Sequence, residues 1–405
     1  MSAADIQNPE TEQEVAGIVA AANAAGLTLE VRGGGTKLSI GRPVQAASTL
    51  SLARLTGITN YDPSELVMAA RAGTPLAEVE AALAANNQML TFEPMDYRPL
   101  LGATGEPTVG GVFAANISGP RRILAGAARD SLLGVRFVNG TGEIVKSGGR
   151  VMKNVTGLDL VKLLAGSWGT LGVLCEVTFK VLPRPETAVT VTIAGLNDAE
   201  AAEAMAAATA MSVEVSGAAH LPESVVRKVA GGSLSGGPVT LLRLEGLAAS
   251  VTVRTERLVA EMARRGAVTV LDAASTDGLW RDIRDVKPFA GGGMKPVWRV
   301  SVAPSAGHQL VAALRLKTGV DAFYDWQGGL VWLQMEADPD AGLIRQYIKA
   351  LGGGHATLVR ASAATRAAVP VFEPQPMALE GLTRRIKDQF DPRGVLNPGR
   401  MTETM

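Results

Sequence analysis

The sequence has one cysteine, Cys175, and only three histidines among its 405 residues. One thiol cannot form an intrachain disulfide or hold an iron–sulfur cluster by itself. Cys175 lies in the apolar run 172–179, where a buried and unreactive thiol is expected. His220, His308 and His355 are widely spaced and lack the spacing of metal ligands. The sequence therefore predicts no metal centre.

The sequence also lacks a charge imbalance and long hydrophobic runs. Lys plus Arg and Asp plus Glu number 39 each, so the composition offers no basic surface for nucleic acid or an anionic membrane. No apolar run approaches the length of a membrane span, and residues 1–10 are polar and acidic, without a signal-peptide core. We therefore expect a cytoplasmic protein without nucleic-acid binding or direct membrane insertion.

What the sequence does have is three glycine-rich stretches. The first follows the strand-like run 27–31 and consists of Arg32, Gly33, Gly34, Gly35, Thr36 and Lys37. Its glycines permit positive φ and turn several N–H groups into one concavity that suits phosphate oxygens. The hydroxyl and the two flanking cations would add to such a site. Taken alone, however, a glycine triplet is more often a surface turn between strands.

The other two stretches share the same small-residue character. In residues 106–120, Gly110 and Gly111 let the backbone approach a flat or extended ligand, and Asn116 supplies an amide. The third stretch, residues 157–173, leads directly into the apolar run 173–179. Three such stretches within 150 residues favour a bound ligand over three unrelated turns.

The predicted elements of the first part alternate between helix and strand. A helix is expected with Asn8 as N-cap and Gly26 just past its end. A second follows Pro75, and strands 133–138 and 143–145 form a hairpin around Asn139-Gly140, a pair that tolerates positive φ. The prolines at 183 and 185 mark a domain boundary.

From residue 186 onwards, strand-like runs alternate with Ala-rich helical runs. The strands are expected at 189–193, 239–244, 297–302 and 330–335, and the helices at 198–211, 249–265, 306–316 and 341–351. This alternation indicates a sheet with helices on one side. A last amphipathic helix is expected at 379–390, and no short-period repeat is evident. We expect three parts, 1–185, 186–365 and 366–405.

The glycine-rich stretches together resemble the FAD-binding domain of the vanillyl-alcohol oxidase/p-cresol methylhydroxylase superfamily. The motifs follow in family order: Arg-Gly-Gly-Gly-Thr from residue 32, Thr-Val-Gly-Gly-x-x-Ala-x-Asn-x-Ser-Gly from 108, Arg-Asp-x-x-Leu-Gly from 129, Gly-x-Asp-Leu-x-Lys-Leu from 157 and Gly-Ser-x-Gly-Thr-Leu-Gly-Val from 166. Residues 390–400 resemble the C-terminal signature of FAD-linked oxidases, and within the superfamily the whole chain is similar to the E-subunit family of glycolate oxidases.

The resemblance implies an α+β fold: a two-part FAD-binding domain of the p-cresol methylhydroxylase type, a ferredoxin-like α+β cap, and a C-terminal segment that returns to the flavin. It also implies that FAD is bound non-covalently. Relatives with covalent flavin place a His after the glycine run or a Cys nearby, whereas this chain has Thr36 there and its only cysteine at position 175.

The resemblance also implies which residues contact FAD. Gly33, Gly34, Gly35 and Thr36 would hold the pyrophosphate, with Arg32 and Lys37 beside them, and the ribityl chain and flavin would lie along Thr108, Val109, Gly110, Gly111, Ala114, Asn116 and Gly119. Further candidates are Pro94, Gly157, Gly169, Thr170, Gly172 and Val173. Asn397 would approach the flavin, or else serve as a turn residue before Pro398.

The resemblance implies a glycolate oxidase complex that contains a catalytic FAD subunit and an iron–sulfur subunit. Oxidising a small 2-hydroxy acid needs a base for the hydroxyl proton and a clamp for the carboxylate. His355 is the candidate imidazole, while Arg284, three residues after Arg281, and Arg299 are candidate cations. A structural His and a self-paired helix face are the alternatives.

Two other functions remain open at this point. One is a self-sufficient FAD-dependent 2-hydroxy acid dehydrogenase, and the other is a scaffold subunit whose FAD is structural or absent.

Overall fold

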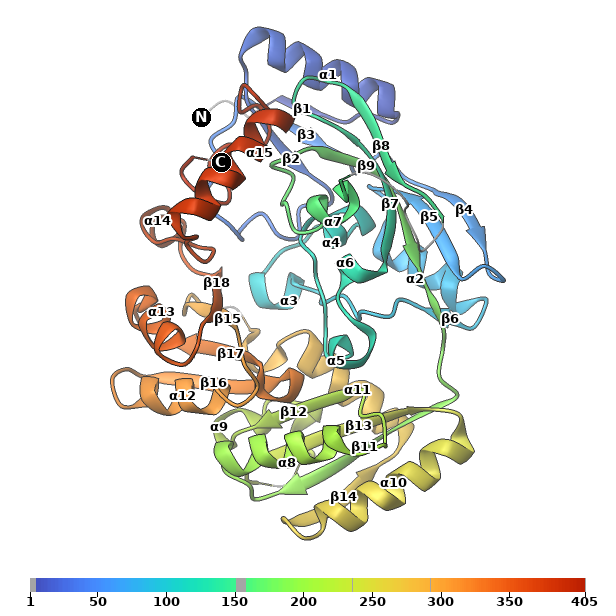
Figure 1. Cartoon of the computed structure of the whole chain (residues 1–405), viewed down its shortest axis with the longest axis vertical. Coiled ribbons are helices and arrows are strands. Elements are labelled where there is room, and N and C mark those ends of the chain that lie inside the picture. The colour runs from blue at the N-terminus through green and yellow to red at the C-terminus, as the bar shows by residue number, and fades with distance from the viewer. Residues whose placement is uncertain (1–4, 151–157, 235, 292, 405) are drawn as a thin grey trace.

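The computed structural model of the chain describes residues 5–150, 158–234, 236–291 and 293–404. Figure 1 shows two parts. One is built from the N-terminal residues together with the C-terminal helices, and the other is a broad sheet covered by helices. The mixture of helix and sheet agrees with the α+β class predicted from the sequence. Among the described residues, no helix is both long enough and apolar enough to cross a bilayer.

Two main sheets form the N-terminal part. Within the described residues, a three-stranded parallel sheet has the order β1-β3-β2 and a five-stranded antiparallel sheet has the order β4-β5-β9-β7-β8. The strands are β1 (Asp5–Gln7), β2 (Leu29–Arg32), β3 (Ser48–Ser51), β4 (Ile58–Asp62), β5 (Val67–Arg71), β7 (Leu132–Val138), β8 (Ile144–Gly148) and β9 (Val173–Lys180), with a separate pair β6 (Gln88–Met89) and β10 (Leu182–Pro183). Strand β2 ends immediately before the glycine triplet, so the parallel sheet presents this turn at its carboxyl edge, where ligands commonly bind.

The helices of this part are α1 (Glu12–Ala25), α2 (Leu76–Ala84), α3 (Arg98–Leu101), α4 (Val109–Ala114), α5 (Arg122–Ala125), α6 (Ala128–Ser131) and α7 (Leu160–Leu164). The prediction of Asn8 as the N-cap of the first helix is wrong. The cap is Thr11, whose hydroxyl accepts the Glu14 N–H at 3.2 Å, because residues 5–7 pair with β3 as a strand. The predicted end holds, since Gly26 takes a left-handed φ of 66°.

The predicted hairpin of β7 and β8 is confirmed, but its turn works differently from the prediction. Asn139 does not take a positive φ; instead, its side-chain oxygen accepts the backbone N–H groups of Thr141 and Glu143 at 3.0 and 2.9 Å. Gly142 takes the positive φ of 89°. Side-chain hydrogen bonding therefore shapes this turn, as it does in Asx turns.

The second part is one antiparallel sheet with the order β14-β11-β13-β12-β16-β17-β15-β18 within the described residues. Its elements are β11 (Thr187–Ala194), α8 (Asp198–Ala210), β12 (Gly217–Leu221), α9 (Glu223–Val226), β13 (Val239–Gly246), α10 (Ala248–Met262), β14 (Ala267–Leu271), α11 (Ala273–Arg284), β15 (Val297–Val302), α12 (Gly307–Arg315), β16 (Val320–Asp325), β17 (Leu330–Met335), α13 (Ala341–Ala350) and β18 (Gly354–Arg360). The four predicted strands and the four predicted helices are all present, and β12, β14, β16 and β18 are additional.

This sheet contains the same supersecondary unit twice. β11-α8-β12-β13-α10-β14 and β15-α12-β16-β17-α13-β18 are both βαββαβ units with the ferredoxin-like strand order, joined where β12 meets β16. The sequence shows no repeat, because the two units share a pattern of burial and not residue identity. Helices α8, α10, α12 and α13 cover one face, and α11 with the N-terminal part covers the other in a continuous apolar core.

Buried ion pairs fasten the sheet to the N-terminal part. Glu93 accepts two hydrogen bonds from Arg243, both at 2.9 Å, and Arg121 donates to Glu245 at 2.6 Å. Burial alone raises the pKa of the Glu245 carboxyl, but Arg243 and Arg121 outweigh it and lower the pKa to about 2. Each of these pairs joins the sheet to the N-terminal part.

The C-terminal segment returns to the N-terminal part through α14 (Ala363–Ala368) and α15 (Met377–Phe390), the latter matching the predicted last helix. The end of α15 packs against the β7–β8 hairpin, where the carbonyl of Phe390 accepts the Gly140 N–H at 2.8 Å. Lys387, which is buried, donates to Asp391 at 2.6 Å and to the carbonyl of Thr170 at 2.7 Å. These bonds attach the residues after α15 to the third glycine-rich stretch. The predicted domain limits at 185 and 365 stay predictions.

Candidate functional site

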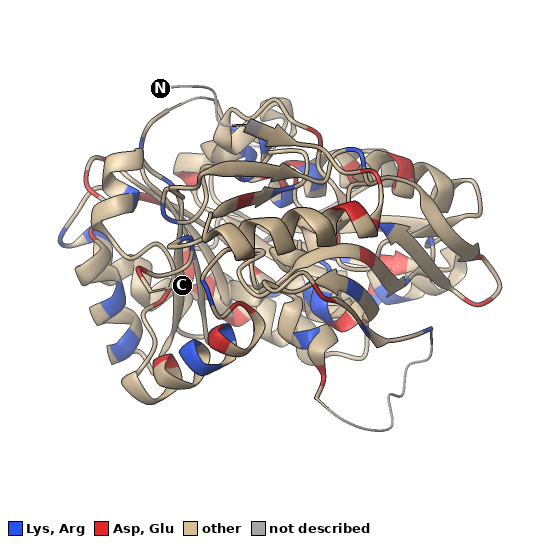
Figure 2. Cartoon of the chain, turned by 90° about the horizontal axis from the view of Figure 1, so that it is seen from above, with Lys and Arg blue, Asp and Glu red and all other residues tan. Residues whose placement is uncertain are grey.

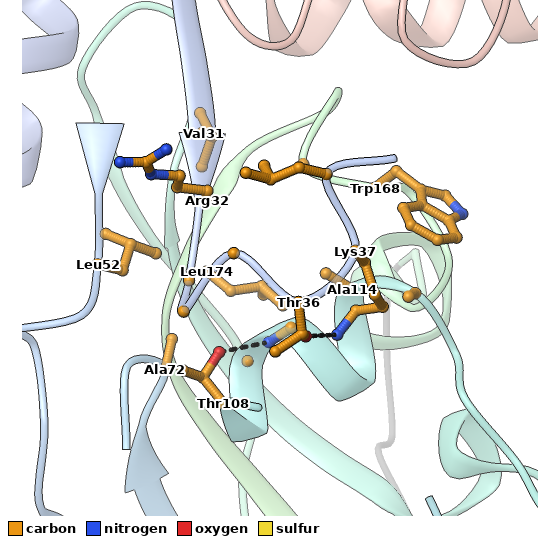
Figure 3. A pocket seen from close by; sticks show the side chains of 18 of the residues that line it. Val31, Arg32, Thr36, Lys37, Leu52, Ala72, Thr108, Ala114, Trp168 and Leu174 are labelled. Atoms are coloured by element: carbon orange, nitrogen blue, oxygen red, sulfur yellow. Dashed lines mark hydrogen bonds between the residues drawn. The ribbon is translucent and has the colours of Figure 1, made fainter. Parts of the chain in front are cut away.

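The first glycine-rich turn and helix α4 line a pocket at the end of strand β2 (Figure 3). The predicted cofactor residues that line it are Arg32, Gly33, Gly34, Gly35, Thr36, Lys37, Thr108, Gly110, Gly111, Ala114, Gly169 and Gly172. They come from three stretches of sequence that together span residues 32–172. The structure therefore brings the three glycine-rich stretches together, as the resemblance implied.

Glycine is required in the turn because the chain passes directly over residues 105–108. A Cβ on Gly34 would overlap the carbonyl oxygen of Glu106, and a Cβ on Gly33 would overlap the hydroxyl of Thr108. Gly35 has a φ of 82°, a conformation that residues with a side chain rarely adopt. These three glycines line the pocket themselves.

Lys37 and Arg400 lie in the pocket and, like Arg32, form no salt bridge with a carboxylate of the described residues. Burial, followed by the nearby Arg400, lowers the pKa of Lys37 to about 8, and burial lowers the pKa of Arg400 to about 10. Lys37 Nζ donates to Thr36 Oγ1 at 3.2 Å, and Arg400 donates to the carbonyl of Lys37 at 3.0 Å. An anion in the pocket would stabilise the charged forms of both side chains, so these residues fit a pyrophosphate.

Arg32 and Thr108 differ in what they offer the pocket. In Figure 3 the guanidinium of Arg32 points away from Thr36 and Lys37. Thr108 caps helix α4, and its hydroxyl accepts the Gly111 N–H at 3.4 Å. Of the two predicted flanking cations, Lys37 is therefore the one directed at Thr36, and the sequence did not single out Arg400.

Asn397 binds backbone and lines neither this pocket nor its neighbour. Its side-chain oxygen accepts the Val31 N–H at 2.7 Å, and its amide donates to the carbonyl of Trp168 at 2.8 Å. Asn397 is buried, and its backbone has a positive φ of 44°. It ties the C-terminal segment to β2 and to the third glycine-rich stretch, which corresponds to the turn-residue alternative.

The remaining cofactor candidates lie in several places. Val109, Thr170 and Val173 are buried in the core behind the pocket, and Pro94 lines a separate polar cavity between the two parts. Gly157 lies outside the described residues.

A second cavity adjoins the first and shares Ala115 and Trp168 with it. Asn116 and Gly119 line it on the side of the N-terminal part. The three catalytic candidates, Arg284 from α11, Arg299 from β15 and His355 from β18, all line this cavity. Helix α11 and the sheet therefore bring together residues that lie up to 71 positions apart in the sequence.

The three candidates differ in their surroundings. Arg284 donates to Asp285 through two hydrogen bonds of 2.8 Å, which is the self-paired arrangement, and Arg281 lines the separate polar cavity instead. Arg299 stacks on the indole ring of Trp326, 4.8 Å from its centroid. His355 remains exposed at the cavity, and partial burial, followed by Arg299 and Arg122, lowers its pKa.

The cavity also holds residues that sequence reasoning missed. Arg122 stacks on Trp326 at 4.4 Å, and Tyr97 and Asp325 line the wall near Arg299. Burial, aided by Glu93, raises the pKa of the Asp325 carboxyl to about 7. Arg122 follows the second glycine-rich motif, which ends at Gly119, and no pattern in the sequence connects it with Asp325. Within the described residues, no group of three or more His, Cys, Asp or Glu is placed to hold a metal ion.

Residues 4–148 match the family described as FAD binding domain. The fold is similar to that of p-cresol methylhydroxylase with substrate bound, at a TM-score of 0.71 and 14% identity over 98% of this chain and 88% of that one. It is equally similar to 4-ethylphenol oxidase from Gulosibacter chungangensis, with a TM-score of 0.71 and 14% identity over 98% and 89% of the two chains. The chain is therefore an FAD-binding protein with the p-cresol methylhydroxylase fold, as predicted.

Sequence relatives narrow the family further. The chain is 35% identical over 382 residues to the glycolate oxidase subunit GlcE of Escherichia coli, which covers 92% of each protein. Over 180 residues it is 33% identical to a D-lactate dehydrogenase of Archaeoglobus fulgidus, which covers 44% of this chain and 39% of that protein. The chain belongs to the GlcE family of FAD-linked oxidoreductases. Its predicted cofactor, FAD, and its enzyme class are confirmed.

Proposed function

We propose that this chain is an FAD-bearing subunit of a glycolate oxidase complex that oxidises glycolate, or another small 2-hydroxy acid, to the 2-oxo acid. The observation that carries the proposal is the pair of adjoining cavities. One is lined by the glycine turn and by Lys37 and Arg400, which have no carboxylate partner among the described residues, and the other is lined by arginines. Similarity to the GlcE subunit over 92% of the chain supports the same function.

In this proposal the pyrophosphate of FAD lies on the turn from Gly33 to Thr36, beside Lys37 and Arg400. The flavin end extends past Ala115 and Trp168 to the second cavity. FAD supplies a two-electron acceptor, while the protein binds it, orients it and excludes water. The attachment is non-covalent, because Thr36 follows the triplet and Cys175 is buried in β9, where burial raises the pKa of its thiol.

Electrons would leave this chain for partner subunits. With a single cysteine, the chain needs an iron–sulfur subunit for any cluster, and we propose that it assembles with that subunit and with a catalytic FAD subunit. In Figure 2, acidic and basic residues are interspersed over the helices and strands, and neither sign gathers over one region of this view. We propose a cytoplasmic location, in which partner subunits could hold the chain at the inner face of the membrane.

Copurification and spectroscopy test this function. We expect the purified chain to be yellow, to hold one FAD that denaturation releases, and to transfer electrons from glycolate to an acceptor when its partner subunits are present. A folded but colourless chain that gains no thermal stability from added FAD would support the scaffold alternative and overturn the proposal.

A further inference from the structure

We propose that the second cavity is this chain's own substrate site, in which Arg122 and Arg299 bind the carboxylate of a small 2-hydroxy acid and Asp325 accepts its hydroxyl proton. The inference rests on the proposed function, because it needs FAD as the oxidant. It goes further by assigning the oxidation to this chain and not only to a partner subunit.

The two arginines are held in place but carry no carboxylate partner. Both guanidinium groups stack on the indole of Trp326, at 4.4 and 4.8 Å from the ring centroid. Trp326 is itself fixed, because its Nε1 donates to the carbonyl of Gly119 at 2.9 Å. The structure therefore positions two cations from different parts of the chain on one rigid aromatic ring.

Their lack of partners distinguishes these arginines from their neighbours. Within the described residues, neither Arg122 nor Arg299 forms a salt bridge or a side-chain hydrogen bond. Nearby Arg121, Arg243 and Arg284 are all paired with carboxylates. Burial lowers the pKa of both Arg122 and Arg299, which expresses the free-energy penalty of an uncompensated cation. A substrate carboxylate would remove that penalty and accept the paired N–H groups that a guanidinium presents.

Asp325 has the features of a proton acceptor. It ends strand β16, lines the cavity and is only 2% exposed. Its Oδ1 accepts the Trp326 N–H at 2.7 Å, and Oδ2 has no hydrogen-bond partner among the described residues. The charged groups that act on it are Glu93, Arg243 and Arg299, and burial is the main reason that its pKa rises to about 7. A base with a pKa near neutrality is the most effective at physiological pH.

The placement of the walls suits this chemistry. Residues 115–119 and Trp168 line the cavity from the N-terminal part, and Arg299, Asp325 and His355 line it from the sheet. A small acid in this cavity would lie among these charged groups and close to Ala115 and Trp168, which also line the FAD pocket. His355 lies at the exposed side, so Asp325, which is buried, is the better placed base.

The reaction balances with FAD as the only oxidant. The hydroxyl O–H bond breaks and its proton goes to Oδ2 of Asp325, while the adjacent C–H bond breaks and its electron pair leaves with the hydrogen as hydride to FAD. A C=O bond forms, so the 2-hydroxy acid becomes a 2-oxo acid by a two-electron oxidation. No metal is required by this step, because the arginines supply the positive charge.

Binding of oxalate tests the carboxylate clamp without any turnover. Oxalate has the carboxylate but no C–H bond to oxidise, and its affinity for the FAD-loaded chain can be measured by calorimetry. We expect Arg299→Gln and Arg122→Gln each to weaken oxalate at least about tenfold, the effect of losing a charge-assisted hydrogen bond. Arg299→Lys should recover part of the loss. The control Arg264→Gln removes an exposed cation and should leave the affinity unchanged.

Anaerobic single-turnover reduction tests the base. Asp325→Asn should keep its yellow colour and bind oxalate within about threefold of the parent chain. Its flavin should be reduced by glycolate about a hundredfold more slowly, the lower limit for losing a general base. In the parent chain the rate should rise as pH increases through about 7, and this rise should vanish in the variant.

The outcomes separate this inference from the proposed function. A chain that binds FAD but neither binds oxalate nor is reduced by glycolate overturns this inference alone. This inference is also overturned if the flavin of Asp325→Asn is reduced by glycolate at the parent rate. A chain that binds no FAD overturns the proposed function, and this inference falls with it. Retained FAD shows that each variant is folded, so a loss of oxalate binding is not a loss of structure.

Discussion

Lys37 should take up a proton when FAD binds, if the pyrophosphate lies on the Gly33–Thr36 turn. In the cofactor-free chain its pKa is about 8, against 10.5 for an ordinary lysine. This difference corresponds to about 3 kcal/mol of unfavourable environment for the charged form. The two negative charges of a pyrophosphate would offset that penalty and return the pKa towards its ordinary value.

The expected size of the effect depends on pH. At pH 7 the lysine is already protonated, so binding should take up only about 0.1 proton. At pH 9 it is mostly neutral, so binding should take up about 0.9 proton. Calorimetry of FAD binding in buffers with different ionisation enthalpies measures this number directly.

Two variants test whether Lys37 is the group that takes up the proton. Lys37→Met should lose the uptake at pH 9 and bind FAD about ten- to a hundredfold more weakly, since a charge-assisted hydrogen bond to the phosphate is lost. Lys146→Met removes an exposed lysine of β8 and should behave like the parent chain. Equal uptake in parent and Lys37→Met, or none in the parent at pH 9, would refute this position for the pyrophosphate.

Three further predictions concern the glycine turn of residues 33–36, the C-terminal segment and the second cavity. Gly34→Ala should lower the free energy of unfolding by about 1–3 kcal/mol and reduce FAD affinity, since the added Cβ overlaps a backbone oxygen that no rotamer change can move away; Gly17→Ala in helix α1, where a Cβ meets nothing within 4 Å, should stabilise the protein slightly in the same urea titration. Asn397→Ala should destabilise the chain by about 1–3 kcal/mol, because it leaves the partly buried Val31 N–H without its acceptor, and FAD should dissociate faster in a fluorescence release assay; unchanged release would show that the C-terminal segment does not support the glycine turn. The cofactor-free chain should lose stability as pH rises from about 4 to about 7, because Asp325 keeps its proton in the folded chain and releases it near pH 3.8 in the unfolded chain. Urea midpoints measured at pH 5 and pH 8 should therefore differ less in Asp325→Asn than in the parent chain.

The sequence predicted those elements that are determined by residues within the element itself. Gly33–Gly35, Asn139 and the Ala-rich helices carry their signals within a few residues, and so the turn, the hairpin and the helices are found where expected. Strand β12, with the residues Gly-Ala-Ala-His-Leu, has no strand signal of its own. It is a strand because it pairs with β13 and β16 and is buried along its whole length.

The substrate cavity was only partly visible in the sequence for a similar reason. Arg299 attracted attention because it interrupts an apolar strand, but Arg122 and Asp325 look like ordinary surface charges. Their roles depend on Trp326, which lies 204 positions after Arg122 and brings both arginines onto one ring. Asn8 failed as a helix cap because a strand pairing at residues 5–7 outweighed a local preference.

The most direct test of whether this chain both binds FAD and uses it is anaerobic mixing of the purified chain with glycolate, without any partner subunit. The visible absorption band of its flavin reports the result. We expect the band to bleach, with Arg299→Gln and Asp325→Asn bleaching more slowly. A flavin that stays oxidised with glycolate alone, and is reduced only when the partner subunits are added, would contradict a substrate site in this chain.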